Sequence, residues 1–212
     1  MRMVKELDYF EIDGAFGGNQ EWFTNVVMNI GGCGAATACD CCIYFARERG
    51  LKELYPFDAE HLSREDYKKF SQIMKPYIRP RAGGVKKLEW FTEGFQKYRK
   101  DCGAGTAKKP VHIKTEEFSG SRPEKEARQL IRTQIDAGIP LACLMLRHKD
   151  KEKFKDFIWH WFLIVGYEET QEDFRVVIAT YGERTVFSLR ELWNTGFEEK
   201  GGLVTFHFTN GE

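Results

Sequence analysis

The chain has 212 residues, of which 42% are hydrophobic and 30% are charged, the composition of an ordinary soluble globular protein. Its 32 acidic and 32 basic residues cancel, so bulk charge provides no attraction to nucleic acid or to an anionic membrane. The N-terminal segment has no apolar stretch of signal-peptide length, and the longest apolar run, residues 157–165, is too short to span a bilayer. We therefore expect a cytoplasmic protein that binds neither nucleic acid nor membranes.

The N-terminal half of the chain predicts helices. Residues 1–32 are rich in glycine and weakly periodic, which indicates a structured loop with a short helix near residues 22–29. Three longer helices are expected over residues 33–48, 63–77 and 85–99. Gly50 is suited to end the first of them, and Ser63 is the N-cap candidate of the second.

The C-terminal half predicts mainly strands. Strands are expected over 111–118, 141–146, 157–167, 174–180, 185–187 and 203–208. Their residues are apolar and, outside 141–146, include β-branched or aromatic side chains. A helix with Ser121 as its cap and Pro123 in its first turn follows the first strand, and a short helix is expected over 188–193. This segregation favours a single α+β domain, with a helical lobe over about 1–105 and a β-sheet lobe over about 106–212.

Cys33 is the first candidate for chemistry because it stands where a loop gives way to a helix, in the sequence Gly31-Gly32-Cys33-Gly34. A helix N-terminus offers unpaired N–H groups and a partial positive charge, and both favour a thiolate over a thiol. The glycines let a substrate backbone approach closely. The alternative is that Cys33 is a small buried residue beside a flexible turn.

His160 is the second candidate, and it lies in an expected strand that is apolar on both faces. A histidine in such a strand is commonly a core residue with a backbone partner. Its functional role requires a thiol across a cleft. A cysteine at a helix start, followed roughly 130 residues later by a histidine on a sheet, fits the arrangement of two-lobe cysteine proteases. Trp159 and Trp161 flank His160 and are expected in the core or in the wall of a cleft.

Several short motifs resemble the papain-like cysteine peptidase superfamily. The run Gly-Gly-Cys-Gly-Ala-Ala at 31–36 is similar to the nucleophile turn of that superfamily. His160, followed by an apolar run and the Gly-Tyr pair at 166–167, resembles its base strand. The Tyr-Gly pair at 181–182 looks like the aromatic–glycine pair that follows the asparagine orienting the imidazole.

Residues 127–146, a helix and a strand joined by Asp136-Ala-Gly-Ile-Pro140, resemble the branch of bacteriocin leader peptidases, the peptidase C39-like proteins. Residues 50–120 resemble no family that we can name. The resemblance implies a papain-like two-lobe fold without a cofactor or metal. It also implies cleavage of a peptide or another amide bond by a Cys33 thiolate with His160 as base.

The chain departs from the superfamily pattern at two positions. Where the superfamily has its orienting asparagine, this chain has Ala179-Thr180, so the Thr180 hydroxyl is a possible orienter, with an ordinary strand residue as the alternative. The glutamine of the oxyanion hole usually lies a few residues before the cysteine, whereas Gln20 lies much further ahead. Gln20 and the Cys33 N–H are the expected oxyanion donors, and the alternative for Gln20 is an exposed loop amide.

Other functions remain open on the sequence. The same Cys–His pair could serve an acyltransferase or an amidase, and the loss of the asparagine also fits a catalytically inactive papain-like binding module. Cys39, Cys41 and Cys42 raise the possibility of a thiol-rich or metal-binding protein. No second ligand pair at a zinc spacing accompanies them, so we expect buried small residues on the helix. The sequence indicates neither the identity of the substrate nor the oligomeric state.

Overall fold

The computed structural model describes residues 2–81, 84–103 and 111–210, and within them it has a mixed α/β fold. The helices are α1 (Val26–Gly31), α2 (Cys33–Glu48), α3 (Arg64–Met74), α4 (Leu88–Asp101), α5 (Glu124–Asp136) and α6 (Leu189–Trp193). The strands are β1 (Met3–Glu6), β2 (Glu11–Ile12), β3 (Ala15–Phe16), β4 (Val111–Ser119), β5 (Leu141–Met145), β6 (His160–Glu169), β7 (Phe174–Thr180), β8 (Glu183–Ser188) and β9 (Gly201–Asn210). Short 3-10 helices are η1 (Gln20–Trp22), η2 (Lys52–Leu54) and η3 (Lys155–Phe157).

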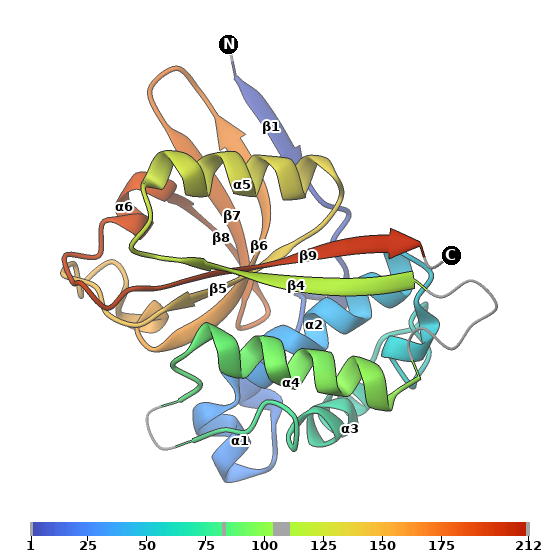
Figure 1. Ribbon diagram of the computed structural model, residues 1–212. Helices are drawn as coiled ribbons and strands as arrows, with labels where there is room; N and C mark the ends of the chain where they lie inside the picture. The colour runs from blue at the N-terminus through green and yellow to red at the C-terminus, as the bar shows by residue number, and fades with distance from the viewer. Residues whose placement is uncertain (1, 82–83, 104–110, 211–212) are drawn as a thin grey trace.

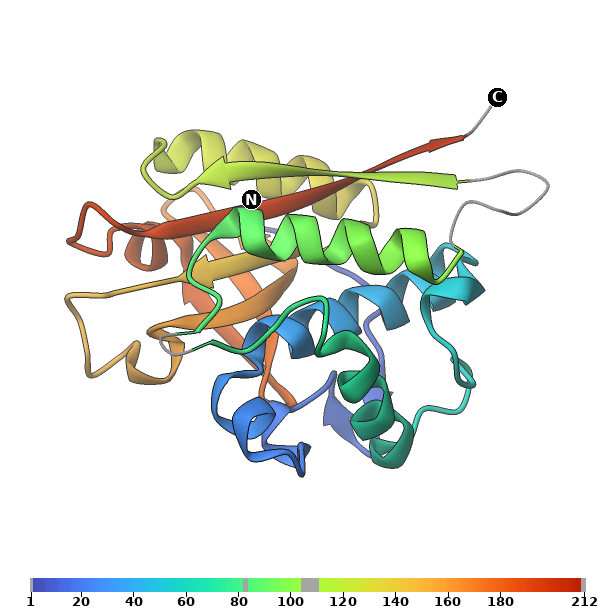
Figure 2. The same ribbon diagram turned by 60° about the horizontal axis from the view of Figure 1, so that its bottom comes forward.

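One antiparallel sheet forms the centre of the molecule. Among the described residues it has seven strands in the order β4-β9-β5-β6-β7-β8, with β1 paired to the C-terminal part of β6. Helices α2 and α4 cover one face, and α5 and α6 cover the other (Figures 1 and 2). Every residue of β5 is buried because both faces of the sheet are covered. Hydrophobic cores therefore lie on both sides of the sheet.

Helix α2 is almost entirely buried between the sheet and the other helices of its layer. Phe45 packs edge-on against Phe206 of β9, with ring centroids 5.1 Å apart. Trp161 of β6 stacks on Phe91 of α4 at 4.5 Å, and its indole N–H donates to the Val85 carbonyl at 2.6 Å. A fully buried aromatic side chain contributes roughly 2–3 kcal/mol. These contacts fix the C-terminal part of α2 against β9 and the start of β6 against α4.

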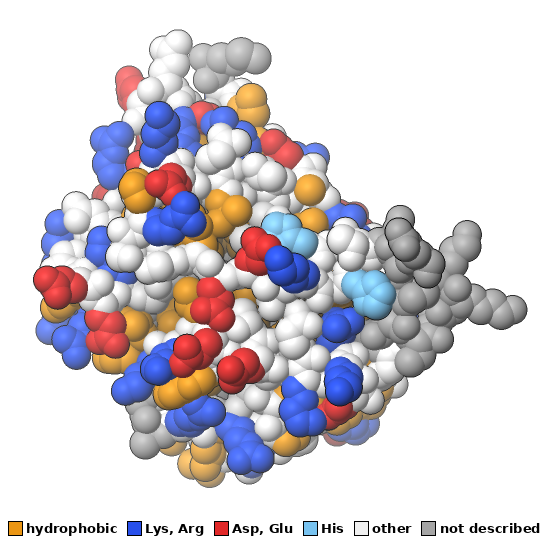
Figure 3. Space-filling view, in the orientation of Figure 1, with side chains coloured by type: hydrophobic (Ala, Val, Ile, Leu, Met, Phe, Trp, Pro, Cys, Tyr) orange, Lys and Arg blue, Asp and Glu red, His pale blue; other side chains and the backbone are white. Residues whose placement is uncertain are grey.

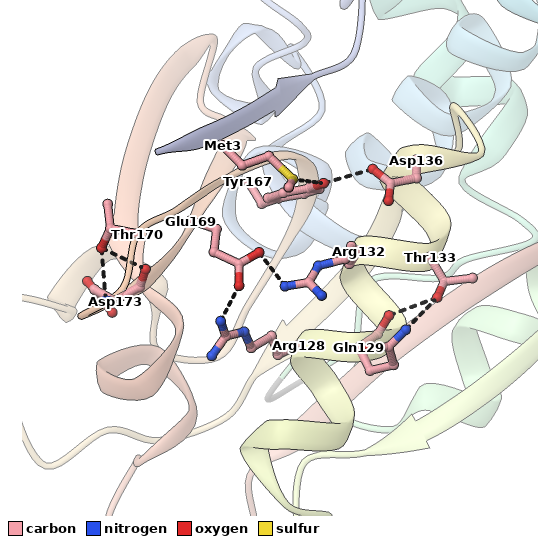
Figure 4. A network of polar contacts seen from close by, with 10 residues as sticks. All are labelled: Met3, Arg128, Gln129, Arg132, Thr133, Asp136, Tyr167, Glu169, Thr170 and Asp173. Atoms are coloured by element: carbon pink, nitrogen blue, oxygen red, sulfur yellow. Dashed lines mark hydrogen bonds and ion pairs between the residues drawn. The ribbon is translucent and has the colours of Figure 1, made fainter. Parts of the chain in front are cut away.

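Helix α5 is tied to the opposite end of β6 by a polar network (Figure 4). The guanidinium groups of Arg128 and Arg132 both donate to the Glu169 carboxylate. Hydrogen bonds from Arg128 and Arg132 hold the pKa of Glu169 below its ordinary value. Tyr167 donates its hydroxyl hydrogen to Asp136 at 2.8 Å. Because Glu169 and His160 lie at opposite ends of β6, the network fixes a helix and takes no part in the candidate site.

The surface shows no segregation of charge on the face drawn in Figure 3. Lysine and arginine side chains are interspersed with aspartate and glutamate there, in keeping with the equal numbers of acidic and basic residues. None of the described helices is both long enough and apolar enough to cross a membrane.

Most of the predicted helices and strands are confirmed. Helix α2 begins at Cys33 and ends at Glu48, and Gly50 follows it with a φ of 66°. The Ser63 side chain caps α3 by accepting from the Asp66 N–H. The expected boundary between the two lobes, near residue 105, lies outside the described residues.

Three predictions about local structure are wrong. The residue that precedes α5 is Pro123 and not Ser121, whose N–H is instead donated to the Ser119 hydroxyl in a turn. Residues 157–159 do not belong to a strand, because η3 ends at Phe157 and β6 begins only at His160. Residues 3–6 form a strand of the large sheet, although little periodicity marks them, because pairing with β6 supplies their hydrogen bonds.

Candidate active site

Cys33 is the first residue of α2, and its environment follows from the chain that precedes it. Helix α1 ends at Gly31, so only Gly32 separates the two helices. A Cβ atom at Gly32 would lie 2.2 Å from the Met28 carbonyl oxygen, and therefore only glycine fits the junction. The backbone N–H groups of Trp161, Gly34 and Cys33 itself face the sulfur and stabilise its thiolate form. The predicted position of the thiol at a helix N-terminus is confirmed.

His160 opens β6 and is held by the neighbouring strand. Because Leu163 pairs with Ala179, Thr180 lies diagonally across from His160 on β7. The Thr180 Oγ1 lies 2.7 Å from Nε2 of the imidazole. The structure thus brings the possible orienter to the candidate base.

Tyr181 covers the imidazole, a contact that the sequence did not predict. Its ring is parallel to that of His160 within 4°, with centroids 4.5 Å apart, and its hydroxyl lies 3.2 Å from Nδ1. Because the rings are stacked, this hydroxyl approaches the face of the imidazole and leaves the in-plane lone pair of Nδ1 available. Trp159 and Tyr181 have positive φ angles of 55° and 54°, which is uncommon for aromatic residues. Such strained backbone clusters at functional sites.

Gln20 is half-buried in η1 and is not an exposed loop amide. Its Nε2 donates to the Asn29 carbonyl at 3.0 Å, which fixes the orientation of the amide, because a flipped amide would set two oxygens against each other. One hydrogen of Nε2 is used in this bond, and the second is available to a ligand. The Oε1 atom is buried without a hydrogen-bond partner among the described residues. A buried polar atom of this kind calls for a ligand or a water.

The four residues expected at the site line one small cavity between α2, η1 and the sheet. Cys33, Gln20, His160 and Thr180 all border it, and its volume is about 10 Å³, room for about one water molecule. No hydrogen bond joins the thiol to the imidazole in the described structure; the Cys33 Sγ lies 4.0 Å from the Trp159 carbonyl oxygen. The residues are thus assembled around one space, in a closed arrangement.

Asp40 also borders this cavity, and the sequence analysis did not single it out. It lies seven residues after Cys33, about two helical turns, and so on the same face of α2. A carboxylate on an otherwise apolar helix face was the signal that could have revealed it. Its carboxyl is 5% exposed and accepts three hydrogen bonds.

Burial makes the resting Cys–His pair uncharged. It raises the pKa of the Cys33 thiol, an effect that the three backbone N–H groups only partly offset. It also lowers the pKa of His160 to about 3. The sequence predicted a thiolate–imidazolium pair, whereas this geometry favours a neutral thiol beside a neutral imidazole, because each charged form loses its hydration in the closed cavity.

The neutral pair predicts how the reactivity of the thiol depends on pH. Iodoacetamide should alkylate Cys33 faster than the other five cysteines, because His160 can take the thiol proton. Since both groups stay neutral between about pH 4 and the raised thiol pKa, the rate should stay level in that range. The measurement is mass-spectrometric quantification of each alkylated cysteine between about pH 5.5 and 9. Half-buried Cys102 is the control for exposure alone. Equal, slow labelling of all six would contradict an activated thiol, and an inflection near the ordinary histidine pKa would contradict the neutral pair.

Of the remaining candidates of the sequence, the three cysteines of α2 lie apart from this cavity, whereas Trp161 borders it. Cys39, Cys41 and Cys42 are fully buried on α2. In the part of the chain that the structure describes, no group of three or more His, Cys, Asp or Glu side chains could hold a metal ion. Trp161 lies in the core and borders the cavity, while Trp159 is 38% exposed beside it.

No family model matches the chain, and no curated protein matches its sequence.

Proposed function

We propose that this chain is a cysteine hydrolase of papain-like two-lobe architecture that cleaves a peptide bond or another amide bond. The observation that carries the proposal is the convergence of four side chains on one cavity: a thiol at a helix N-terminus, an imidazole, the hydroxyl bonded to that imidazole, and an amide. These groups arise from three separate parts of the sequence. Their types are the ones required of a nucleophile, a base, its orienter and an oxyanion donor.

In the proposed reaction, His160 removes the thiol proton as the Cys33 sulfur attacks the substrate carbonyl. A C–S bond forms, the amide C–N bond breaks, and the imidazolium returns the proton to the leaving amine. Water then attacks the thioester, releasing the acid and restoring the thiol. The Cys33 N–H and the second Nε2 hydrogen of Gln20 are the donors available to the oxyanion. Substrate binding must open the closed cavity, because about 10 Å³ cannot hold an acyl group.

The tautomer of His160 decides whether this proton transfer is possible. Nδ1 can accept the thiol proton only if Nε2 carries the ring hydrogen and donates it to the Thr180 hydroxyl oxygen, 2.7 Å away. Thr180 therefore takes the role of the orienting asparagine in this proposal.

Thr180→Val is expected to slow alkylation of Cys33 by about threefold to tenfold, since it removes one hydrogen bond worth roughly 1 kcal/mol. Valine has nearly the shape of threonine, so packing in β7 should be kept. Thr180→Ser retains the hydroxyl and should react at nearly the wild-type rate. The rate of Cys33 alkylation by iodoacetamide is the measurement, and an unchanged rate in Thr180→Val would assign the residue to packing.

A catalytically inactive binding module is the second candidate. Two observations favour it: the uncharged state of the buried pair and the lack of a hydrogen bond between Sγ and the imidazole in the described structure. Catalysis and binding are separated by incubating the protein with a complex peptide pool and detecting new termini by mass spectrometry. Termini that form with the wild-type protein but not with Cys33→Ala support the hydrolase, whereas their absence from both digests supports the inactive module.

A further inference from the structure

The carboxyl group of Asp40 binds three donors that belong to three different segments. Its Oδ2 accepts from the Tyr9 hydroxyl at 2.8 Å and from the Gly18 N–H at 3.1 Å. Its Oδ1 accepts from the Tyr67 hydroxyl at 2.8 Å. A buried carboxyl is costly unless its lone pairs are satisfied, and these three bonds supply that satisfaction. Asp40 therefore joins α2 to the segment before β2, to α3 and to the loop of Gly18.

The Gly18 loop, residues 17–20, carries Gln20 to the cavity and is held from two sides. On one side, the Gly18 N–H is bound to Asp40 of the helix that begins at Cys33. On the other side, the Gly182 N–H donates to the Gly18 carbonyl at 3.0 Å, and Asn19 Nδ2 donates to the Tyr181 carbonyl at 2.9 Å. The loop thus spans the space between the helix with the thiol and the turn beside the imidazole.

Close packing around the Asp40 carboxyl requires glycine at two positions of this loop. A Cβ atom at Gly17 would lie 2.9 Å from Asp40 Oδ2, and the φ of Gly17 is +76°. A Cβ atom at Gly18 would lie only 2.0 Å from the phenol of Tyr67. The loop can therefore approach the carboxyl because it lacks side chains there, and a larger residue at either position must displace the loop or the side chains packed on it.

The hydrogen bonds accommodate the carboxyl in either protonation state. Burial raises the pKa of Asp40 to about 6, although bonds from Gly18, Tyr67 and Tyr9 oppose this rise. The Tyr67 hydroxyl also lies 3.2 Å from the Ala36 carbonyl, so it can donate there and accept a hydrogen from Asp40. The Gly18 N–H can donate to Oδ2 whether the Asp40 carboxyl is ionised or protonated on Oδ1, so this bond does not depend on the protonation state.

We propose that Asp40 is a positioning residue of the site: its carboxyl ties the Gly18 loop to the nucleophile helix and so holds the Gln20 amide at the oxyanion position. The inference rests on the proposed function and adds the group that aligns the oxyanion donor with the thiol. Asp40 itself does not contact the reacting atoms in this proposal. It acts through Asn19, the one residue that separates Gly18 from Gln20.

Two reagents separate this role from general damage to the site. Acetylation of Cys33 by p-nitrophenyl acetate forms a C–S bond, expels p-nitrophenolate and passes through an oxyanion; the thiol proton goes to His160 and then to solvent. Alkylation by iodoacetamide displaces iodide at a saturated carbon without an oxyanion. Asp40→Ala is expected to slow acetylation of Cys33 at least about tenfold, less than the roughly 100-fold to 1000-fold cost of removing an oxyanion donor, because the Gln20 amide is displaced and not removed. Alkylation should change less than about threefold. Mass spectrometry of the peptide that contains Cys33 measures both rates.

Asp40→Asn is the rescue variant, since its amide oxygen can still accept from Gly18 and its NH2 can donate to Tyr67. Acetylation should stay within about threefold of the wild-type rate. Tyr55→Phe removes a buried hydroxyl that has no partner among the described residues, and it should change neither rate. Hydrogen exchange of the Gly18 amide adds a readout independent of chemistry: exchange should accelerate in Asp40→Ala and stay protected in Asp40→Asn.

The outcomes distinguish this inference from the proposed function. Unchanged acetylation in Asp40→Ala, or a parallel fall of the acetylation and alkylation rates, would overturn the positioning role of Asp40 and leave the proposed function standing. A wild-type protein that reacts with neither reagent at Cys33 would overturn both. If Asp40→Ala does not fold, Gly18→Ala tests the same tie from the loop, because its methyl group would clash with the Tyr67 phenol beside the loop while the Asp40 carboxyl remains. Undiminished acetylation in that variant, together with accelerated exchange of the amide at position 18, would equally overturn the inference.

Discussion

Cys33→Ala is expected to abolish both peptide cleavage and acetylation at this site, with a loss of at least about 1000-fold, because no other group can form the thioester. The fold should survive, since the described structure shows the sulfur bonded weakly: it lies 4.0 Å from the Trp159 carbonyl and otherwise faces backbone N–H groups. Initial rates of cleavage of the best peptide in the pool measure the effect. Equal melting temperatures of the variant and the wild-type protein show that both are folded.

Cys39→Ala is the matched control for this experiment. It makes the same substitution in the same helix at a fully buried position outside the cavity, so it should keep cleavage within about twofold if the protein stays folded. Cleavage that persists in Cys33→Ala would exclude Cys33 as the nucleophile. Termini seen with both variants would then come from another group or from a contaminating peptidase.

His160→Gln is expected to slow acetylation of Cys33 by about 100-fold or more, the usual contribution of a general base. Glutamine can still bond to Thr180, but it cannot take a proton at neutral pH. Because burial lowers the pKa of His160 to about 3, the imidazole of the wild-type protein is neutral above about pH 4. The rate of Cys33 acetylation in the wild-type protein should therefore show no inflection near the ordinary histidine pKa. The rate should fall through protonation of His160 only in strong acid.

The control for His160→Gln is His148→Gln. His148 is also buried, but its imidazole bonds to the Glu191 carbonyl at 3.0 Å and accepts from the Asp150 N–H, away from the cavity. Its acetylation rate should match that of the wild-type protein. Equal rates in His160→Gln and the wild-type protein would leave Cys33 without a base and would favour the inactive module. A wild-type inflection near pH 6.5 would show that the cavity opens to solvent before it reacts.

The helix that carries the thiol was predictable because its signals are local. A glycine-rich loop, a run of small residues and a terminal glycine fix the beginning and end of α2 from neighbours in sequence. Strands β7 and β9 carry their own β-branched and aromatic residues. By contrast, β1 owes its hydrogen bonds to a partner more than 150 residues away, so its own four residues do not mark it.

Site residues divide in the same way. Cys33 and His160 were chosen from residue type and position, and the structure brings both to one cavity. Thr180 and Gln20 were chosen through a resemblance, and their contacts depend on strand register and on a loop bond to Asn29. Tyr181 was noted only as part of a dipeptide, because stacking on an imidazole depends on a backbone angle of +54° that no sequence pattern reveals.

The sequence by itself determined the order of helices and strands, the thiol at the start of a helix and the identity of its candidate base, since each depends on side chains within a few turns or strand residues. Only the tertiary structure decided that the cavity is closed, that the pair is uncharged at rest, and that Asp40 holds the loop of Gln20. The physical reason is that the burial and the hydrogen bonds of a site residue are supplied by segments far from it in the sequence. The loss of hydration and the positions of the hydrogen-bond partners are therefore set only when those segments pack together.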